Sequence, residues 1–365
     1  MANKVIISGG GTGGHIFPAI AIANALRKIQ PGIEILFVGA LGKMEMEKVP
    51  AAGYQILGLD IQGINRLSLL KNALLPFKMV KSLLKSRKII KEFNADVAIG
   101  VGGYASGPLL MMANMMDIPT LIQEQNSFAG KTNISLGKRA KRVCVAYEGM
   151  EKFFPASKIV LTGNPIRHES VNIQGKREQA LASFGLELNK KTILVTGGSL
   201  GAGTLNDCIK LNLQKLDHAG VQVIWQCGGY YFDRLTKEIG DNLPSCIKLM
   251  PFVQDMSMAY AACDLTIARA GAGTISELCI VGKPAVLVPS PSVAEDHQTK
   301  NALSLVNKSA AIMIKDQEAR EVLVDNELNL LQKTDKIIEL GKNIKELALQ
   351  DADEVIAKEV LSLIK

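Results

Sequence analysis

A glycine-rich loop that directly follows an apolar strand constrains this chain more than any other feature of its sequence. Residues 5–8 (Val-Ile-Ile-Ser) predict a strand, residues 9–14 read Gly-Gly-Gly-Thr-Gly-Gly, and an apolar helix is expected over about residues 18–29. Glycines let the backbone approach an anion, and the free N–H groups and dipole of the following helix favour negative charge there. The loop therefore predicts a phosphate-binding unit of an α/β fold, without saying which phosphate compound it serves.

The same pattern begins again in the second half of the chain. Thr192–Thr196 predicts a strand, residues 197–203 read Gly-Gly-Ser-Leu-Gly-Ala-Gly, and residues 204–216 predict a helix. A third glycine-rich helix start follows at residues 269–277, and residues 334–365 predict two helices. A repeated strand–loop–helix unit indicates two similar α/β domains rather than one long sheet. Residues 162–167 are expected to form the linker between them.

The first loop also fits the dinucleotide pattern G-x-G-x-x-G, as Gly9, Gly11 and Gly14. A nicotinamide enzyme of this kind carries an Asp or Glu that binds the ribose, about 20 residues beyond the glycines. The second strand, expected over residues 33–38, ends at Gly39 and Ala40 and has no acid at this carboxyl end. The missing carboxylate argues against an oxidoreductase.

Composition places the chain among ordinary globular proteins. Of its 365 residues, 47% are hydrophobic and 21% are charged, which is enough for two cores. The six cysteines are scattered without a C-x-x-C pair, so buried free thiols in a reducing compartment are expected. No signal peptide and no apolar run of about 18 residues is recognised, which predicts a protein that stays in the cytoplasm.

The net charge of +7 is unevenly distributed. Residues 1–163 carry 20 Lys and Arg against 10 Asp and Glu, and the remainder carries 22 against 25. Residues 61–91 contain no acid and mix cations with large apolar residues. This mixture suits an anionic bilayer surface. For the helix expected from Pro76 onward, the alternative fits equally well: an amphipathic helix that packs on the sheet and exposes its lysines to solvent. The Leu67–Phe77 part favours the membrane more.

The residue types of two further groups in this half indicate what these groups do. Phe77 is the one aromatic residue of the basic stretch at residues 61–91, so this stretch offers no stacking platform for nucleic acid. Four methionines of the helix expected after residue 107 are interpreted as core filler, because Met fits irregular gaps. These are Met111, Met112, Met115 and Met116.

Seven short motifs, in order from residue 9 to residue 302, together resemble the MurG family of bacterial UDP-N-acetylglucosamine transferases. Each motif is weak alone, and their order and spacing make the resemblance specific. They are residues 9–15 (GGGTGGH), 102–104 (GGY), 123–126 (QEQN), 163–167 (GNPIR), 197–202 (GGSLGA), 271–277 (GAGTISE) and 296–302 (DHQTKNA). Residues 41–94 match mainly in character, and the tail after about residue 310 carries no motif.

The resemblance implies a GT-B fold, an α/β architecture of two Rossmann-like domains separated by a cleft. Residues 1–163 would form an N-terminal domain that binds the acceptor and associates with the membrane. Residues 164–349 would form the C-terminal domain that binds the UDP-sugar, and a last helix at about 350–365 is expected to pack back onto the first domain. No cofactor is implied.

The resemblance also implies which residues hold the donor. Ser199 and its loop would stabilise the diphosphate, where charge develops as UDP leaves. The backbone of Val253 would contact uracil, and the Glu277 carboxylate would accept hydrogen bonds from both ribose hydroxyls. The alternative for Glu277 is that it lies in the first turn of a helix and stabilises the helix N-terminus. The remaining donor contacts are assigned to Thr12, Gly13, Gly14, Asn126, Arg167, Ala272, Gly273, Thr274, Ile275, Ser276 and Gln298.

For several of these residues a second interpretation stays open. The loop of Thr12, Gly13 and Gly14 could instead bind the diphosphate of the acceptor. Arg167 could contact the donor phosphate or pair with a carboxylate. Asn126 and Gln298 are expected to bind sugar hydroxyls, since amides donate and accept at once.

His15 is the candidate general base, because it stands in the first glycine loop and imidazole titrates near neutrality. Glu124 is the second candidate, and a role of His15 in orienting the loop is the alternative. Tyr104 is assigned to the acceptor side. Asp351 and Asp353 superficially resemble the D-x-D of metal-dependent transferases, but a helix start explains them better, so no metal site is predicted.

The leading hypothesis is an inverting glycosyltransferase of peptidoglycan synthesis. It would join N-acetylglucosamine from UDP-GlcNAc to the 4-hydroxyl of the muramoyl sugar of lipid I, giving lipid II. Its expected partners are these two substrates and the anionic cytoplasmic face of the cell membrane, to which it would bind as a peripheral protein. Other cell-wall synthesis proteins are compatible partners, and nucleic acid is not expected to be one. The rivals are a UDP-N-acetylglucosamine 2-epimerase, a nicotinamide oxidoreductase and a silent sugar-nucleotide sensor.

Overall fold

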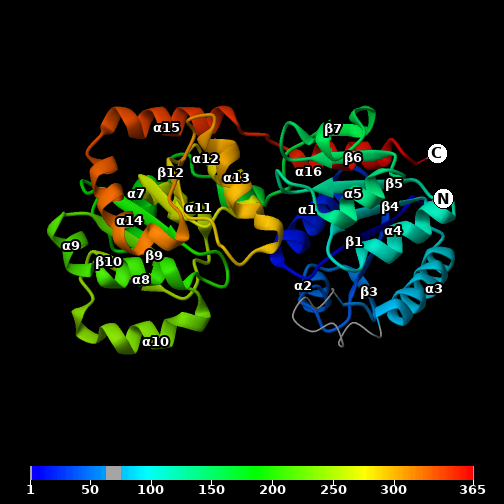
Figure 1. Cartoon of the computed structure of the whole chain (residues 1–365), viewed down its shortest axis with the longest axis horizontal. Helices are drawn as coiled ribbons and strands as arrows, with labels where there is room; N and C mark the ends of the chain where they lie inside the picture. The colour runs from blue at the N-terminus through cyan, green and yellow to red at the C-terminus, as the bar shows by residue number, and fades with distance from the viewer. Residues whose placement is uncertain (1, 63–74, 365) are drawn as a thin grey trace. The chain divides into compact units, whose positions relative to one another are not determined.

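The structure is a computed structural model that describes residues 2–62 and 75–364. The chain divides into two compact units (Figure 1). Unit 1 comprises Met1–Ile166 and Gln350–Lys365, and unit 2 comprises Arg167–Leu349. Each unit is built on its own parallel sheet, which confirms the predicted α/β fold class.

The sheet of unit 1 has seven strands in the order β3-β2-β1-β4-β5-β6-β7, and all neighbours are parallel. Most of its strands are almost wholly buried, because helices cover both faces of a parallel sheet. The strands are β1 (Lys4–Gly9), β2 (Glu34–Ala40), β3 (Gln55–Leu59), β4 (Val97–Gly102), β5 (Thr120–Glu124), β6 (Arg142–Val145) and β7 (Ile159–Leu161).

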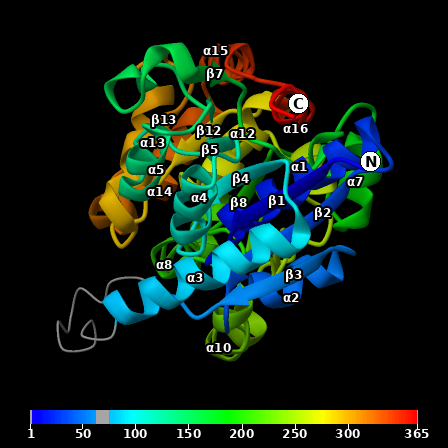
Figure 2. The same cartoon turned by 90° about the vertical axis from the view of Figure 1, so that its right-hand side faces the viewer.

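Alternate residues of these strands face two separate cores. Ile7 and Phe37 pack with α1 and α16 on one face, whereas Ile6 and Leu36 pack with α3, α4 and α5 on the other. Helices α3 and α4 lie next to each other on this second face (Figure 2). The helices are α1 (Gly13–Ile29), α2 (Glu45–Ala51), α3 (Leu75–Phe93), α4 (Ser106–Met115), α5 (Lys131–Gly137) and α16 (Ala352–Leu361).

The C-terminal helix α16 belongs to unit 1 although it follows the last helix of unit 2 in the sequence. It packs against α1 and places Ile356 and Val360 in the same core as β1. Lys28 of α1 pairs with Glu354 at 2.7 Å. The chain thus crosses from unit 1 to unit 2 and back.

Unit 2 repeats the design with six parallel strands in the order β10-β9-β8-β11-β12-β13. Its core contains the fully buried Trp225, whose indole N–H donates to Asn206 at 2.9 Å. The strands are β8 (Thr192–Thr196), β9 (Gln222–Gln226), β10 (Ile247–Met250), β11 (Leu265–Ala268), β12 (Ala285–Leu287) and β13 (Ile312–Met313).

The helices of unit 2 include α14, which the sequence pattern did not predict. They are α6 (His168–Val171), α7 (Arg177–Ser183), α8 (Gly203–Leu211), α9 (Leu213–His218), α10 (Gly229–Ile239), α11 (Met256–Ala262), α12 (Ala272–Val281), α13 (His297–Val306), α14 (Asp316–Leu331) and α15 (Thr334–Glu346). The last two helices of the chain, α15 and α16, confirm the two that were predicted after residue 334.

Two predicted helices have other bounds. The first begins at Gly13, not at residue 18, because the Thr12 carbonyl already accepts from the His15 and Ile16 N–H groups, and Pro18 lies one turn inside. The helix predicted over 204–216 is two helices that break at Asn212, whose side chain donates to the Cys208 carbonyl at 2.9 Å. Such a local bond competes with helix continuation.

The predicted role of the methionines is wrong for two of the four. Met112 and Met116 do pack into the core of unit 1, but Met111 and Met115 point outward and are 44% and 64% exposed. All six cysteines are free, as predicted, and Cys246 alone among them is only partly buried.

Candidate functional site

In both sheets the strand order reverses beside the first strand, between β1 and β4 in unit 1 and between β8 and β11 in unit 2. Ligands of open α/β sheets bind at this point, outside the carboxyl ends of the strands. The glycine loops that follow β1 and β8 lie there, and so do the loops that follow β4 and β11. Each unit therefore carries one candidate site at its own sheet.

The first glycine loop leads from β1 into α1 and has few amides to spare. The Gly10 N–H donates to the Gly102 carbonyl at 3.2 Å, and the Gly11 N–H donates to Glu45 at 2.8 Å. Thr12 is the N-cap of α1, and the first turn, which contains Gly13 and Gly14, has no acidic residue and no side-chain cap. Any anion at this loop must therefore bind at residues 12–14.

The ring of His15 is held by the backbone of Gly10 and the hydroxyl of Thr12. Its Nδ1 lies 3.0 Å from the Gly10 carbonyl oxygen and 3.3 Å from Thr12 Oγ1. A carbonyl oxygen can only accept, so this contact puts the proton on Nδ1 and leaves the lone pair on Nε2. The ring also lies against Gly102, where a Cβ atom would come within 2.7 Å of Nε2. His15 is thus held in the tautomer that a base acting through Nε2 requires.

Exposure differs between Tyr104, assigned to the acceptor side, and Glu124, the second candidate for the base. Tyr104 follows β4 and is 52% exposed, whereas Glu124 ends β5 and is 2% exposed. Glu124 Oε1 accepts from the backbone and side-chain N–H groups of Asn126, at 3.1 and 3.3 Å. Its Oε2 accepts from Gly130 at 3.1 Å and from Asn133 at 2.8 Å. A carboxylate that already accepts four hydrogen bonds shapes its loop, which favours His15 over Glu124 as the base.

The second glycine loop, in unit 2, leads from β8 into α8. Ser199 is exposed at its tip. Behind the loop lies Gln226, the last residue of β9, which is 3% exposed. Its amide donates to the Gly198 carbonyl at 2.9 Å and to Thr196 Oγ1 at 3.3 Å, and its Oε1 accepts from the Val253 N–H at 3.0 Å. One buried amide therefore joins the predicted diphosphate loop to the predicted uracil contact.

The hydrogen bond to Gln226 limits which group of Val253 can contact uracil. The Val253 side chain is buried, and its N–H is already donated to Gln226. The backbone group of Val253 that remains suited to a uracil contact is its carbonyl, which can accept from the N3–H of the base.

The third glycine-rich motif forms the start of α12. Gly271 is the N-cap, and the first turn contains Ala272, Gly273 and Thr274 without any acid or side-chain cap. These first-turn amides have no partner within the helix and favour an anion. The next two residues contribute less: the Ile275 side chain is buried, and Ser276 Oγ donates to the Ala272 carbonyl at 3.0 Å.

Glu277 lies beyond the first turn of α12, so its alternative interpretation as a first-turn glutamate is wrong. Its Oε1 accepts from Ser170 Oγ at 2.9 Å, and its Oε2 accepts from Tyr260 Oη at 2.9 Å. Burial raises the pKa of the Glu277 carboxyl, while the hydrogen bonds from Tyr260 and Ser170 and the charge of Arg167 lower it. Each carboxylate oxygen has two lone pairs, so both keep one for a ribose hydroxyl.

Arg167 and Gln298 are the remaining predicted donor contacts. Arg167 is exposed, and its charge lowers the pKa of Glu277. Its two interpretations, contact with the donor phosphate and pairing with a carboxylate, both stay predictions. Gln298, in the first turn of α13, accepts from the Ser290 N–H at 2.8 Å, so its carbonyl orients the loop after β12. Its amide group is the part suited to a sugar hydroxyl.

Two residues at these loops were missed by the sequence reasoning, Glu45 and Gln226. Gln226 ends a parallel strand, and the rule that singled out residues 124–126 could have found it. Glu45 stands between charged and apolar residues of a short helix, and no pattern in the sequence marks it as buried.

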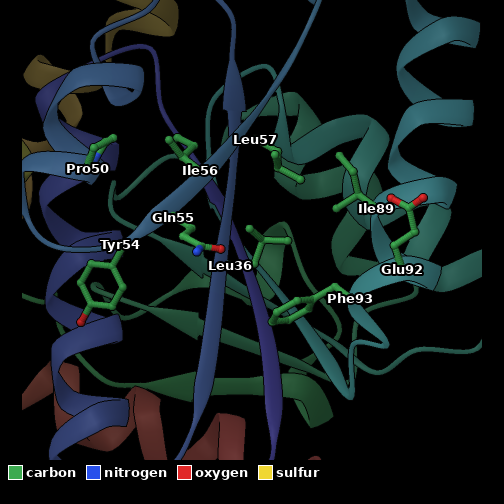
Figure 3. A pocket seen from close by; sticks show the side chains of 9 residues that line it. All are labelled: Leu36, Pro50, Tyr54, Gln55, Ile56, Leu57, Ile89, Glu92 and Phe93. Carbon is green, nitrogen blue, oxygen red and sulfur yellow. The ribbon is translucent and has the colours of Figure 1, made fainter.

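Other features of the described chain lie apart from these loops. A pocket of about 610 Å³ lies between the edge strand β3 and α3 (Figure 3), and none of the predicted site residues lines it. Residues 2–62 and 75–364 contain no group of three or more His, Cys, Asp or Glu that could hold a metal ion. Asp351 is the N-cap of α16 and Asp353 lies in its first turn, which confirms the helix-start interpretation of that motif.

Comparison with known proteins agrees with the two-domain description. The sequence profile of the glycosyltransferase family 28 N-terminal domain matches residues 5–145, and that of the family 28 C-terminal domain matches residues 192–356. A relative from Bacteroides fragilis is 55% identical over 99% of this chain and 96% of its own length. It is named UDP-N-acetylglucosamine--N-acetylmuramyl-(pentapeptide) pyrophosphoryl-undecaprenol N-acetylglucosamine transferase.

Solved structures extend the comparison. The crystal structure of Acinetobacter baumannii MurG is 31% identical, covers 99% of both chains and has a TM-score of 0.81. A UDP-GlcNAc 2-epimerase from Neisseria meningitidis has a TM-score of 0.67 with only 13% identity, over 99% of this chain and 100% of that one, so it shares the fold alone. The near full-length identity, the two family 28 domains and the GT-B architecture agree, and this chain belongs to the MurG family of glycosyltransferases.

Proposed function

We propose that this enzyme transfers N-acetylglucosamine from UDP-GlcNAc to the 4-hydroxyl of the muramoyl sugar of undecaprenyl-pyrophosphoryl-MurNAc-pentapeptide. The product is lipid II, the precursor of peptidoglycan, so the enzyme serves cell-wall synthesis and with it cell shape and division. The observation that carries the proposal is the 55% identity, over 99% of this chain, with a relative named for that reaction. The epimerase alternative rests only on a shared fold at 13% identity.

The residues of unit 1 supply the base. The acceptor 4-hydroxyl gives its proton to His15 Nε2 as its oxygen attacks the anomeric carbon of the donor sugar, and UDP leaves from the opposite face with inversion. The tautomer set by the Gly10 carbonyl supports this role, because the lone pair lies on Nε2. Thr12, Gly13, Gly14 and Tyr104 are assigned to the substrates at this loop.

The residues of unit 2 hold the donor and stabilise its leaving group. We assign the diphosphate to Ser199 and to the first-turn amides of α12, because negative charge grows on the diphosphate as the sugar bond breaks. The Val253 carbonyl is assigned to uracil and Glu277 to the ribose. Asn126 of unit 1 and Gln298 are assigned to the hydroxyls of the transferred sugar.

We further propose that α3 and α4 bind the cytoplasmic face of the membrane. Five large apolar side chains on these two adjacent helices are exposed by 44% to 73%, and the exposed cations Lys81, Arg87 and Lys88 share α3 with them. The apolar residues are Phe77, Val80, Leu84, Met111 and Met115. No helix of the described chain is long and apolar enough to span a bilayer. Most of the Leu67–Phe77 segment, expected to favour the membrane more, lies outside the described residues.

The activity is tested with purified protein, UDP-GlcNAc and a lipid I analogue. We expect UDP and a β-1,4-linked disaccharide, both dependent on the acceptor. Conversion of UDP-GlcNAc alone to its 2-epimer would instead support the epimerase, and donor binding without any turnover would support a sensor.

The membrane proposal is tested by sedimentation with vesicles of anionic and of zwitterionic lipid. Phe77→Ser combined with Leu84→Ser should weaken binding to anionic vesicles at least about tenfold, since each buried apolar side chain contributes about 1.5–3 kcal/mol. The matched control is Leu211→Ser, a similarly exposed leucine of α8 in unit 2. Equal binding of all three proteins would contradict the proposal.

A further inference from the structure

Glu45 is a buried carboxylate that neither the fold nor the proposed reaction accounts for. It is the first residue of α2 and is 1% exposed. Its Oε2 accepts from the Gly11 N–H at 2.8 Å and its Oε1 from the Ala40 N–H at 3.0 Å. Within residues 2–62 and 75–364 it has no cationic partner. Since a buried carboxylate is costly without partners, these two amides are what hold it in place.

The chain makes room for this side chain on both sides. A Cβ atom at Gly10 would lie 2.2 Å from Glu45 Oε1, and a Cβ atom at Gly39 would lie 2.5 Å from its Cγ. The loops after β1 and β2 therefore close directly on Glu45. The fit indicates a built arrangement rather than a carboxylate trapped by chance.

The same peptide group that Glu45 binds also binds His15. The Gly11 N–H and the Gly10 carbonyl belong to one planar peptide unit, with Glu45 on its N–H and His15 Nδ1 on its oxygen at 3.0 Å. The negative charge polarises this unit and makes its carbonyl a stronger acceptor, because hydrogen bonds in series reinforce each other. Glu45 and His15 are thus linked through a single rigid group.

We propose that Glu45 is a positioning residue for His15, acting through the Gly10–Gly11 peptide. It holds the imidazole in the Nδ1–H tautomer and in the orientation that presents Nε2. This is the arrangement of a base oriented by a third group, with a peptide placed between the acid and the imidazole. The inference rests on the proposed function, in which His15 is the base.

The test compares Glu45→Gln with the matched control Glu47→Gln, an exposed glutamate of the same helix whose carboxylate pairs with Lys48. Glutamine keeps the size of the side chain, but its NH₂ group must face one of the two amide donors. Nitrogen-15 spectra of histidine-labelled protein report the tautomer directly, and the chain has only four histidines, so His15→Ala assigns the signal. Turnover and the KM for UDP-GlcNAc are measured in parallel.

In the wild type we expect His15 as a single Nδ1–H tautomer. Glu45→Gln should give a mixture of tautomers and a kcat about 10- to 100-fold lower, because a misplaced base loses orientation. The KM for UDP-GlcNAc should change less than about twofold, since the donor is assigned to unit 2, and Glu47→Gln should match the wild type in all three measurements. An unchanged tautomer and kcat in Glu45→Gln would overturn the inference.

A second variant covers the case in which Glu45→Gln fails to fold. Gly10→Ala keeps Glu45 but displaces its carboxylate, and it should reproduce the mixed tautomer and lower kcat; a wild-type tautomer there would overturn the inference. UDP binding and thermal melting verify folding. Wild-type turnover in His15→Ala would refute the base of the proposed function, whereas the tautomer of Glu45→Gln decides the role of Glu45 independently.

Discussion

The two glycine loops of this enzyme share one design and differ in the group that holds them. In unit 1 the loop after β1 is held by a carboxylate, Glu45, on the Gly11 N–H. In unit 2 the loop after β8 is held by a neutral amide, Gln226, on the Gly198 carbonyl. The same strand order and the same glycine-rich turn thus have a different charge behind them.

This difference bears on which loop suits the nucleotide diphosphate. A negative charge behind the first loop opposes a second anion there and takes up one of its amides. The neutral amide behind the second loop adds no negative charge at the α8 N-terminus, and no acid occurs in its first turn. The carboxylate that accepts from this turn, Asp316 on Thr204, is paired with Arg269. The comparison therefore supports the base in unit 1 and UDP in unit 2, and three changes test it.

The largest effect is expected from His15→Ala. Loss of a general base should lower kcat by about 10²- to 10⁴-fold. UDP affinity, measured by calorimetry, should stay within about twofold of the wild type, because the nucleotide is assigned to the other loop. Comparable losses in kcat and UDP affinity would break the division of roles and support a loop-orienting role for His15.

Gln226→Glu makes the second loop resemble the first. The new carboxylate cannot donate to the Gly198 carbonyl and places a negative charge behind the diphosphate loop. We expect the KM for UDP-GlcNAc to rise about 10- to 100-fold, consistent with a lost hydrogen bond of about 1 kcal/mol and added repulsion. Gln226→Leu serves as the control and should show a smaller rise; an equal rise would mean that the charge behind the loop is unimportant.

Tyr260→Phe removes one of the two donors to Glu277. Because burial raises the pKa of Glu277 and the Tyr260 bond lowers it, the variant should have a higher pKa there. Donor affinity depends on the ionised carboxylate, so it is present above this pKa and lost as pH falls through it. The KM for UDP-GlcNAc should rise about tenfold near neutral pH. As the pH is lowered, the increase in KM should begin at a higher pH in the variant than in the wild type. A pH profile identical to that of the wild type would contradict a ribose role for Glu277.

The smallest effect concerns Glu327 of α14, a buried carboxyl group that contrasts with Glu45. Both are buried, but neither carboxyl oxygen of Glu327 has a hydrogen-bond partner in the described part of the chain. Burial raises its pKa well above the ordinary value. Glu327→Leu should raise the melting temperature of unit 2 by about 2–4 °C per kcal/mol recovered, with unchanged kcat.

The sign of its pH dependence follows from the raised pKa. The folded state keeps the Glu327 proton that the unfolded chain releases above about pH 4.3, so the stability of the wild type falls as pH rises from there toward the folded-state pKa. The difference in melting temperature between Glu327→Leu and the wild type should therefore widen with pH. A constant difference from pH 4 to 8 would contradict a raised pKa at Glu327.

Local pattern was enough to predict most of the strands. The alternation of apolar segments with glycine turns predicted β8 at Thr192–Thr196 without error, and the ends of β1 and β2 to within two residues. It failed where a single contact decides a boundary, as at Asn212. Helix ends depend on capping contacts that periodicity does not contain.

The amino-acid sequence by itself determined the α/β class, the repeat of the strand–loop–helix unit and the likeness that identifies the family. Tertiary structure alone decided that Glu45 closes on the first loop and that Gln226 joins Gly198 to Val253. Periodicity and glycine turns involve residues that are close in the sequence. The contacts of Glu45 with Gly11 and of Gln226 with Gly198 and Val253 join residues 27 to 34 positions apart. Only the packed sheets bring such residues within hydrogen-bond distance.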